Sequence, residues 1–407
     1  MKLSCRASLI KPSATLAITA KAKKLKSEGK NVVSFGAGEP DFDTPSYIKD
    51  AVKDALDKGF TKYTPVSGID ELKNAIHDKF LTDYGVNYEN NEILVSCGGK
   101  HSLYNLFMVL LNDGDEVIIP SPYWVSYTEI VKLAGGVPVL ADTSSNNFKF
   151  NLDMLKESFS SKTKAVIINS PSNPTGVLLD EKDIIEIAMF AIEKNILIIT
   201  DDIYEKIIFD DKKFFNVLMV DKSLKENTVA VNAVSKTYSM TGFRIGYAAG
   251  HKEIISAMNN LQSQSTSNPT SFAQYGALEA LRGNLDFTMK MKEEFEKRRN
   301  YMLYFFENEI RTIKLVRPDG AFYIFADISE VFKNSGSLIN SSAKFCSYLL
   351  DSYLVAAVPG IEFGNDNYIR LSFATDFNVI KEGLNRIKEA VSIDNLTKNL
   401  NNLNKKI

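Results

Sequence analysis

Residues 227–250 read NTVAVNAVSKTYSMTGFRIGYAAG and contain two short apolar runs separated by a polar loop. The first run, residues 228–234, is rich in β-branched side chains and short enough to predict a buried strand. The second run, residues 244–248, predicts another strand, and the serine, threonine and glycine between the runs are typical of a loop. The pattern therefore places Lys236 just after a buried strand and Arg244 at the start of the next one.

Lys236 and Arg244 are residue types that occur together in one kind of cofactor site. At the end of a buried strand Lys236 is expected to be partly desolvated, which disfavours the ammonium form and frees the amine as a nucleophile. Arg244 offers a fixed fork of donors that suits a phosphate. Together they favour pyridoxal 5′-phosphate held as a Schiff base. The alternative is a surface lysine in a β-hairpin, and this segment alone leaves both interpretations open.

The composition is that of a globular protein without a strong charge bias. The 407 residues suffice for two domains with substantial cores, and they are 44% hydrophobic and 24% charged. The formal charge is −2, so neither a nucleic acid nor an acidic membrane surface is expected as a partner. Three cysteines and three histidines lie scattered without metal-ligand spacing, so no metal is expected. Because no signal-peptide pattern and no apolar run of about 18 residues occurs, a cytoplasmic location is expected.

Strand and helix patterns alternate from residue 92 onward. Short apolar runs predict strands, and amphipathic segments such as residues 181–194 predict helices between them. The predicted strands cover residues 93–96, 116–120, 165–169, 196–200 and 228–234. This order indicates an α/β fold with a doubly wound, mostly parallel sheet. Such sheets bind ligands at the carboxyl ends of their strands, so the residues that follow each strand become candidates for a site.

Glycine, aromatic and polar residues follow each of these strands. In chain order they are Gly98, Gly99 and Lys100, then Trp124, then Asn173, then Asp201 and Tyr204, and finally Lys236 and Arg244. Each has an ordinary alternative, since a tryptophan is often core, an asparagine before proline often marks a turn and an aspartate can cap a helix. Together they suit pyridoxal phosphate, which needs an aromatic against its ring, an amide at its phenolic oxygen and a carboxylate at its pyridine nitrogen. The lysine would form the imine, and the glycines and the arginine would hold the phosphate.

An ordered set of motifs through nearly all of the chain resembles the fold-type I, class I aminotransferases. The nearest group is the bacterial aspartate aminotransferases, in the subgroup that includes prephenate-accepting enzymes. The motifs are FGAGEPDFDTP, KYTPVSG, SCGGK, SPYWVSY, NSPSNPTG, TDDIY, SKTYSMTGFRIGY, SQSTSNP, GAFY, VAAVPGIEFG and YIRLSFA. The resemblance implies a large cofactor-binding domain at residues 46–284. It also implies a small α+β domain that joins residues 1–45, the N-terminal arm, with residues 285–407.

The resemblance assigns a role to each candidate at the cofactor. Lys236 matches the Schiff-base lysine and is the expected catalytic residue. The other implied contacts are Asp201 at the pyridine nitrogen, Asn173 and Tyr204 at the phenolic oxygen, Trp124 on the ring, and Gly98, Gly99, Lys100, Ser235 and Arg244 at or beside the phosphate. Tyr63 matches a tyrosine that reaches the phosphate from the partner subunit, which implies a homodimer with shared active sites.

Substrate contacts are implied in the same way. Arg370 matches the arginine that binds the substrate α-carboxylate, and the backbone of Gly38 borders the same group. Trp124 and Asn173 are implied to contact the substrate as well as the cofactor. These matches imply amino acids and 2-oxo acids as substrates.

The chain departs from parts of the family pattern. Ala233 stands three residues before the lysine, where many relatives have serine or glycine, so a hydroxyl contact to the phosphate is missing. Residues 263–269 lack the partner-subunit arginine that one aspartate aminotransferase subgroup uses for the distal carboxylate. In the subgroup that this chain resembles a lysine serves instead, and Lys100 matches it, helped by the hydroxyls of Ser13 and Thr15.

The resemblance implies a pyridoxal-phosphate-dependent aspartate aminotransferase, which moves the amino group of L-aspartate to 2-oxoglutarate and gives oxaloacetate and L-glutamate. Lys11 and Lys100 could also serve a dicarboxylate as large as prephenate, so the acceptor range stays open. The alternatives are another enzyme of this fold, namely an aromatic or alanine aminotransferase, a β-lyase or a decarboxylase. A non-enzymatic regulator would need a DNA-binding segment and a basic patch, and the sequence has neither feature.

Overall fold

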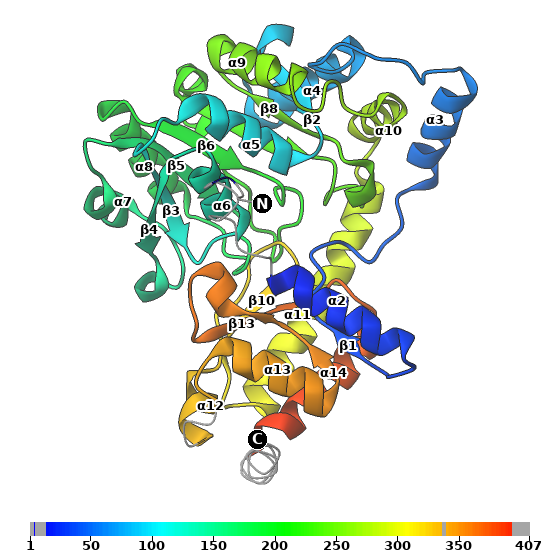
Figure 1. Ribbon diagram of the computed structural model, residues 1–407, viewed down its shortest axis with the longest axis vertical. Coiled ribbons are helices and arrows are strands. Elements are labelled where there is room, and N and C mark those ends of the chain that lie inside the picture. The colour runs from blue at the N-terminus through cyan, green and yellow to red at the C-terminus, as the bar shows by residue number, and fades with distance from the viewer. Residues whose placement is uncertain (1–3, 5–13, 336–338, 393–407) are drawn as a thin grey trace.

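The computed structural model describes residue 4 and residues 14–335 and 339–392. Figure 1 shows a larger part, cyan to green, above a smaller part that is mostly orange and red. Helix α2 (Ala14–Ser27), in blue, lies with the smaller part although it comes from the N-terminal end of the chain. The domain boundaries after residues 45 and 284 stay predictions.

A seven-stranded sheet forms the centre of the larger part in the described residues. Its order is β2 (Ile93–Ser96), β8 (Gly246–Ala249), β7 (Thr228–Ala233), β6 (Leu197–Asp201), β5 (Thr163–Asn169), β3 (Glu116–Ser121) and β4 (Val137–Asp142). Every neighbouring pair is parallel except the two that involve β8, which is antiparallel to both β2 and β7. The expected α/β fold with a mostly parallel sheet is confirmed.

Helices cover both faces of this sheet because its strands are apolar on both sides. In β5, Ala165 and Ile167 pack into one core cluster, whereas Val166 and Ile168 pack into another on the opposite face. The first face is covered by α5 (Gly99–Leu110), α6 (Ser126–Leu133) and α9 (Lys252–Ser263). The second face is covered by α4 (Asp70–Tyr84), α7 (Leu152–Ser158), α8 (Glu181–Glu193) and α10 (Ser271–Arg282). Helix α3 (Ser46–Asp57) packs on α10.

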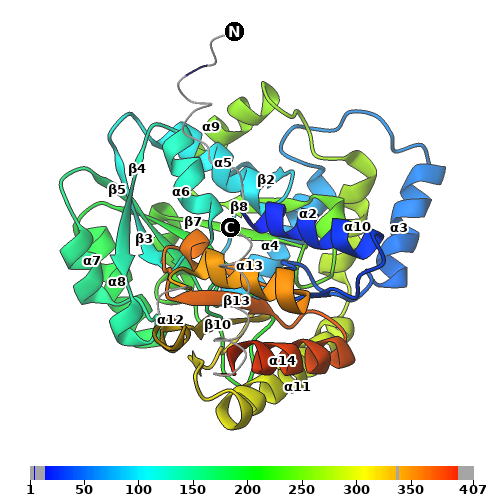
Figure 2. The same ribbon diagram turned by 60° about the horizontal axis from the view of Figure 1, so that its bottom comes forward.

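The smaller part is built on a four-stranded sheet within the described residues. Its order is β12 (Val358–Pro359), β13 (Tyr368–Ser372), β10 (Tyr323–Asp327) and β9 (Lys314–Leu315), with antiparallel pairs. Figure 2 shows the helices that gather around β10 and β13, namely α11 (Asp286–Glu309), α13 (Ser342–Tyr353) and α14 (Phe377–Val391), with α12 (Ser329–Asn334) beside them. In β13, Ile369 and Leu371 join the core with these helices. Arg370 therefore points to the opposite face of the sheet.

The N-terminal segment joins the smaller part through a short parallel pair. Strand β1 (Val33–Ser34) pairs with β11 (Val355–Ala356), and Phe35 enters the core of the smaller part. Six short 3-10 helices complete the described secondary structure: η1 (Asn90–Glu92), η2 (Ser144–Asn146), η3 (Val217–Met219), η4 (Lys222–Asn227), η5 (Thr241–Phe243) and η6 (Gly360–Phe363).

One expected strand begins later than its apolar run predicts. Strand β8 starts at Gly246, and Arg244 lies before it with a left-handed φ of 57° at the end of η5. The expectation that Arg244 begins a strand is therefore wrong. The physical reason is local, because an arginine in this conformation cannot continue an extended strand. The turn instead sends its side chain back toward the loop before α5, where one guanidinium nitrogen donates to the Cys97 carbonyl at 3.4 Å.

Candidate active site

A cavity of about 860 Å³ lies at the carboxyl ends of the parallel strands and reaches to the smaller part. Its walls include residues directly after β5, β6 and β7, together with Arg370 from β13. The candidate residues that line it are Gly38, Gly99, Lys100, Trp124, Asn173, Asp201, Tyr204, Ser235, Lys236, Arg244 and Arg370. The fold thus collects residues that are up to 332 positions apart in the chain, from Gly38 to Arg370.

The surroundings of Lys236 favour the neutral, nucleophilic form of its amine. Its side chain follows β7 in the long connection to β8, and its Nζ donates to the backbone oxygen of Gly38 at 2.5 Å. The pKa of Lys236 is lowered to about 8, mainly by burial; the charge of Glu39 opposes this shift, and the charges of Arg370 and Arg244 add to it. Strands β7 and β8 do form an antiparallel pair, as a hairpin requires. The lysine nevertheless faces the cavity, so the interpretation as a simple surface lysine is not supported.

Asp201 is a buried carboxylate at the last position of β6. Burial raises its pKa to about 6, whereas a hydrogen bond from Tyr127 and the charge of Lys236 lower it. The Tyr127 hydroxyl donates to Asp201 Oδ2 at 2.6 Å. The Asn169 side-chain amide donates to the Asp201 carbonyl at 2.8 Å and ties together the ends of β5 and β6. A cation beside Asp201 would offset the cost of burying its charge.

Arg370 is a guanidinium almost fully removed from water, with 3% of its surface exposed. One nitrogen donates to Asn173 Oδ1 at 3.0 Å and another to the Gly36 carbonyl at 3.3 Å. Its Nε is buried and has no hydrogen-bond partner. Burial lowers the pKa of Arg370 from the usual value for arginine. The chemistry of a buried, incompletely paired guanidinium that lines a cavity suits a carboxylate.

Gly98 and Arg244 meet at the start of α5. Gly98 has a φ of 90°, which favours glycine, and a Cβ added to it would lie 2.4 Å from a guanidinium nitrogen of Arg244. Gly98 itself does not line the cavity, whereas Gly99, the first residue of α5, does. Arg244 is held by donation to the Thr241 carbonyl at 2.8 Å. A helix N-terminus beside an arginine, with Ser235 in the same wall, forms an anion-binding corner.

Lys100 and Trp124 both line the cavity and contact each other. Lys100 Nζ lies 4.9 Å from the centre of the Trp124 ring. Partial desolvation and the charge of Arg244 lower the pKa of Lys100. Because Lys100 touches the indole and not a carboxylate, its charge is available to a ligand that enters the cavity.

The remaining candidates are Tyr63, Ser13 and Thr15, and of these only Tyr63 has a described side chain. Tyr63 is 90% exposed and does not line the cavity of its own chain. Ser13, like Lys11, lies outside the described residues. Thr15 lies in the first turn of α2.

Two aromatic residues of this site escaped sequence reasoning. Tyr127 lies in SPYWVSY, three positions after Trp124, and reaches Asp201 from α6. Tyr323 lies in GAFY, lines the cavity and contacts both Tyr204 and Arg370. Both occur in motifs that carried the resemblance, but their partners are far away in the chain and no spacing rule connects them.

In residues 14–335 and 339–392, together with residue 4, no group of three or more histidine, cysteine, aspartate or glutamate side chains could hold a metal ion. None of the helices in that part of the chain is both long and apolar enough to cross a membrane.

Known proteins resemble this chain in both sequence and fold. Residues 30–387 match the sequence profile of the aminotransferases of class I and II. An aspartate aminotransferase from a Bacillus species is 49% identical over 390 residues, which cover 96% of this chain and 99% of the relative. A probable aspartate/prephenate aminotransferase of Rickettsia prowazekii is 48% identical over 394 residues, which cover 95% of this chain and 98% of the relative.

Solved structures agree with these relatives. The aspartate aminotransferase of Thermus thermophilus, solved with maleate, superposes with a TM-score of 0.88 at 38% identity and covers 95% of this chain and 99% of its own. The enzyme of Rhizobium meliloti gives a TM-score of 0.89 at 39% identity and covers 96% and 99%. The chain therefore belongs to the class I and II aminotransferases and is an enzyme that uses pyridoxal 5′-phosphate as its cofactor.

Proposed function

We propose that this aminotransferase moves the amino group of L-aspartate to 2-oxoglutarate, giving oxaloacetate and L-glutamate, in the cytoplasm. The observation that carries the proposal is a pair of cationic side chains, Arg370 and Lys100, that line one cavity. Two cations match the two carboxylates of aspartate, glutamate and their oxo acids. The names of the Bacillus and Thermus relatives support the same donor. The Rickettsia relative supports prephenate as a further acceptor.

The side chains around the cavity fit pyridoxal phosphate. Burial raises the pKa of the Asp201 carboxyl, and a protonated pyridine nitrogen would supply a cation that stabilises its charged form. Asn173 and Tyr204 would bond the phenolic oxygen, and Trp124 would cover the ring. The phosphate would lie at the corner formed by Gly98, Gly99, Lys100, Ser235 and Arg244, where Gly98 has a positive φ and its backbone lies close to the Arg244 guanidinium. When bound, pyridoxal phosphate supplies an electron-withdrawing ring that stabilises negative charge at the substrate Cα.

The residues of the chain divide the remaining work among them. Arg370 binds the substrate α-carboxylate beside the Gly38 backbone, in a position set by its hydrogen bonds to Asn173 and Gly36. The neutral amine of Lys236 takes a proton from the substrate Cα as a general base and returns one as a general acid in the reverse direction. Its lowered pKa keeps part of the amine neutral near pH 8. The two substrates use the same cavity in turn, as in a ping-pong reaction.

A steady-state assay with a panel of amino donors and 2-oxo acids, prephenate included, tests this proposal. Aspartate with 2-oxoglutarate should give equal amounts of oxaloacetate and glutamate. Alanine or ammonia formed from aspartate, without glutamate, would instead identify a decarboxylase or a lyase and contradict the proposal.

The variant Lys100→Ala tests the second carboxylate site in the same assay. Loss of a charge-assisted contact to a carboxylate should lower kcat/KM for aspartate and glutamate by roughly ten- to a hundred-fold. Alanine and phenylalanine, which lack a distal carboxylate, should be affected little, and they serve as the internal control. Equal losses for acidic and neutral donors would assign Lys100 to the cofactor and leave the distal carboxylate without a partner.

We further propose a homodimer in which Tyr63 completes the active site of the partner subunit. The exposure of Tyr63, at 90%, leaves it free to contact another chain. Subunits with Lys236→Ala and subunits with Tyr63→Ala should each have little activity. After mixing and exchange, hybrid dimers hold one intact site, so activity should recover to about a quarter of the wild-type level.

The matched control mixes Lys236→Ala subunits with Asp201→Asn subunits. Both of these residues line the cavity of the same chain, so no hybrid of this kind contains an intact site. Subunit exchange can be followed by native mass spectrometry. Exchange without recovered activity in the Tyr63 mixture would argue against shared sites.

A further inference from the structure

Tyr323, the first residue of β10, contacts two residues of the site for which different functions are proposed, Arg370 and Tyr204. It is 1% exposed and lines the cavity. The Arg370 guanidinium carbon lies 4.4 Å from the centre of its ring. Its hydroxyl lies 2.9 Å from the Tyr204 hydroxyl, within hydrogen-bond distance. One side chain therefore contacts both the arginine proposed for the substrate and the tyrosine proposed for the cofactor.

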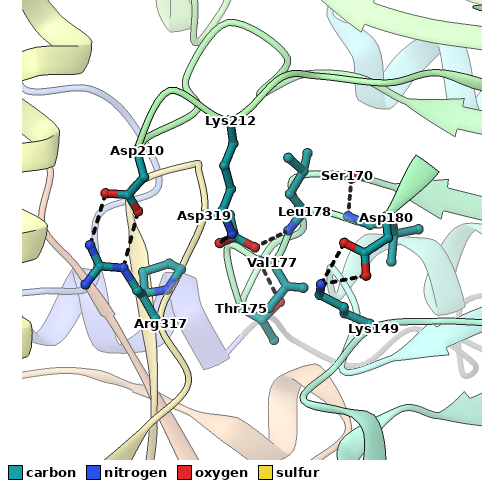
Figure 3. Close-up of polar contacts among 12 residues, drawn as sticks. Lys149, Ser170, Thr175, Val177, Leu178, Asp180, Asp210, Lys212, Arg317 and Asp319 are labelled. Atoms are coloured by element: carbon teal, nitrogen blue, oxygen red, sulfur yellow. Dashed lines mark hydrogen bonds and ion pairs between the residues drawn. The ribbon is translucent and has the colours of Figure 1, made fainter. Parts of the chain in front are cut away.

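The segment before Tyr323 is held firmly in the structure. The Asp319 carboxylate accepts from the Leu178 amide at 3.1 Å and from Lys212 at 2.5 Å, and Figure 3 shows it between these two residues. The backbone amides of Asp319 and Gly320 both donate to the Gly176 carbonyl, at 2.8 and 2.9 Å. These contacts fasten the start of β10 to the loop that carries Asn173.

The backbone two residues before Tyr323 adopts an unfavourable conformation. Ala321 has a φ of 58°, in the left-handed region that is unfavourable for alanine. A Cβ on Gly320 would lie 2.5 Å from the Ile207 carbonyl, so a larger residue cannot fit there. The backbone that leads into Tyr323 is thus held by contacts outside the cavity.

The proposed contact of Tyr204 with the cofactor determines which tyrosine donates the hydrogen bond between Tyr204 and Tyr323. A tyrosine hydroxyl carries one proton. If Tyr204 donates that proton to the phenolic oxygen, the 2.9 Å contact must be donated by Tyr323. Hydrogen bonds in such a chain strengthen one another, so Tyr323 makes Tyr204 a stronger donor.

We propose that Tyr323 is a positioning residue that orients both Arg370 and Tyr204. Its ring is the platform that keeps the guanidinium directed at the substrate carboxylate, and its hydroxyl polarises Tyr204. The proposal rests on the functions proposed above for Arg370 and Tyr204. Tyr323→Phe removes only the hydroxyl and Tyr323→Met removes the ring together with its hydroxyl, so the difference between the two variants isolates the ring.

Calorimetric titration of the holoenzyme with maleate measures how much the Tyr323 ring contributes to binding a dicarboxylate. Tyr323→Met should weaken maleate binding by about 5- to 30-fold, the equivalent of one desolvated contact between a cation and a ring. The KM for aspartate should rise in parallel. Tyr323→Phe keeps the ring and should bind maleate as the wild type does.

The pH dependence of the visible absorption of the bound cofactor measures the effect of the Tyr323 hydroxyl on Tyr204. Weaker donation by Tyr204 disfavours the ionised phenolic oxygen, so in Tyr323→Phe the pH midpoint of the absorption should move up by roughly 0.2–0.6 pH unit. Its kcat should fall while its KM stays unchanged. Arg370, Asp201 and Glu39 are the charged groups near the two hydroxyls, and both variants retain them.

Controls separate failure of this inference from failure of the proposed function. Tyr368→Phe alters a tyrosine of β13 that does not line the cavity and should change nothing. Arg370→Lys should weaken maleate binding, and unchanged binding there would instead contradict the role proposed for Arg370. If Arg370→Lys weakens binding, a folded Tyr323→Met that binds maleate normally overturns the inference. An unchanged absorption midpoint in Tyr323→Phe also overturns it, and this result decides alone if the methionine variant does not fold.

Discussion

Replacing Lys236 by alanine is expected to lower kcat by at least about ten thousand-fold, because the change removes the proton-transferring amine and the bond to the cofactor together. Lys236 is the lysine of the cavity whose pKa is lowered to about 8, and its Nζ makes its hydrogen bond to a backbone carbonyl. The absorbance band of the protein-linked cofactor should disappear. Stopped assays with aspartate and 2-oxoglutarate, together with absorption spectra, measure both effects.

The control for this prediction is a lysine on the protein surface. Lys182 lies on α8 with 81% of its side chain exposed, and Lys182→Ala should leave both kcat and the spectrum unchanged. Circular dichroism should show that both variants are folded. A folded Lys236→Ala protein that keeps its turnover would remove this residue from the reaction.

Replacing Asp201 by asparagine is expected to lower kcat by roughly a hundred- to a thousand-fold, with the cofactor still bound. Asparagine cannot hold the proton of the pyridine nitrogen by charge, so electron withdrawal from the substrate weakens. The Tyr127 hydroxyl can donate to the new amide oxygen as it does to the carboxylate, so the site should stay assembled. Unchanged kcat in a variant that binds the cofactor would contradict this role.

The same variant should be more stable than the wild type when the cofactor is removed. Burial raises the folded-state pKa of Asp201 to about 6, above the usual value of 3.8. Folding therefore favours the neutral acid, and the wild type loses stability as the pH rises from about 4 to 6. Asparagine does not titrate, so above pH 6 the variant should gain roughly 1–3 kcal/mol in free energy of unfolding.

Urea denaturation of the cofactor-free proteins at pH 8 and pH 5 measures this difference. The gain should be smaller at pH 5, where the wild-type carboxyl is protonated. Asp180→Asn is a suitable control, because Asp180 is an exposed carboxylate paired with Lys149 at 2.8 Å. An equal gain at both pH values would show that charge burial is not its cause.

The sheet and most of the cavity residues could be predicted from the sequence, because both depend on local order along the chain. The run at residues 93–96 is β2 as predicted, and residues 228–234 became β7 with a difference of one residue. Parallel strands bring their carboxyl ends to one edge, so Asp201 and Lys236 could be placed together without coordinates. Arg370 and Gly38 were found only through the resemblance, since no strand order links residues so distant.

By itself the sequence determined the α/β class and the residue types that meet a phosphate, a pyridine ring and a carboxylate. Only the tertiary structure decided how these side chains support one another. Tyr127 bonds Asp201, and Tyr323 connects Arg370 with Tyr204. The same holds for the late start of β8, where Arg244 leaves the extended conformation and turns toward the Cys97 carbonyl. These contacts join segments from different elements, and their geometry depends on packing between helices and strands that no local pattern encodes.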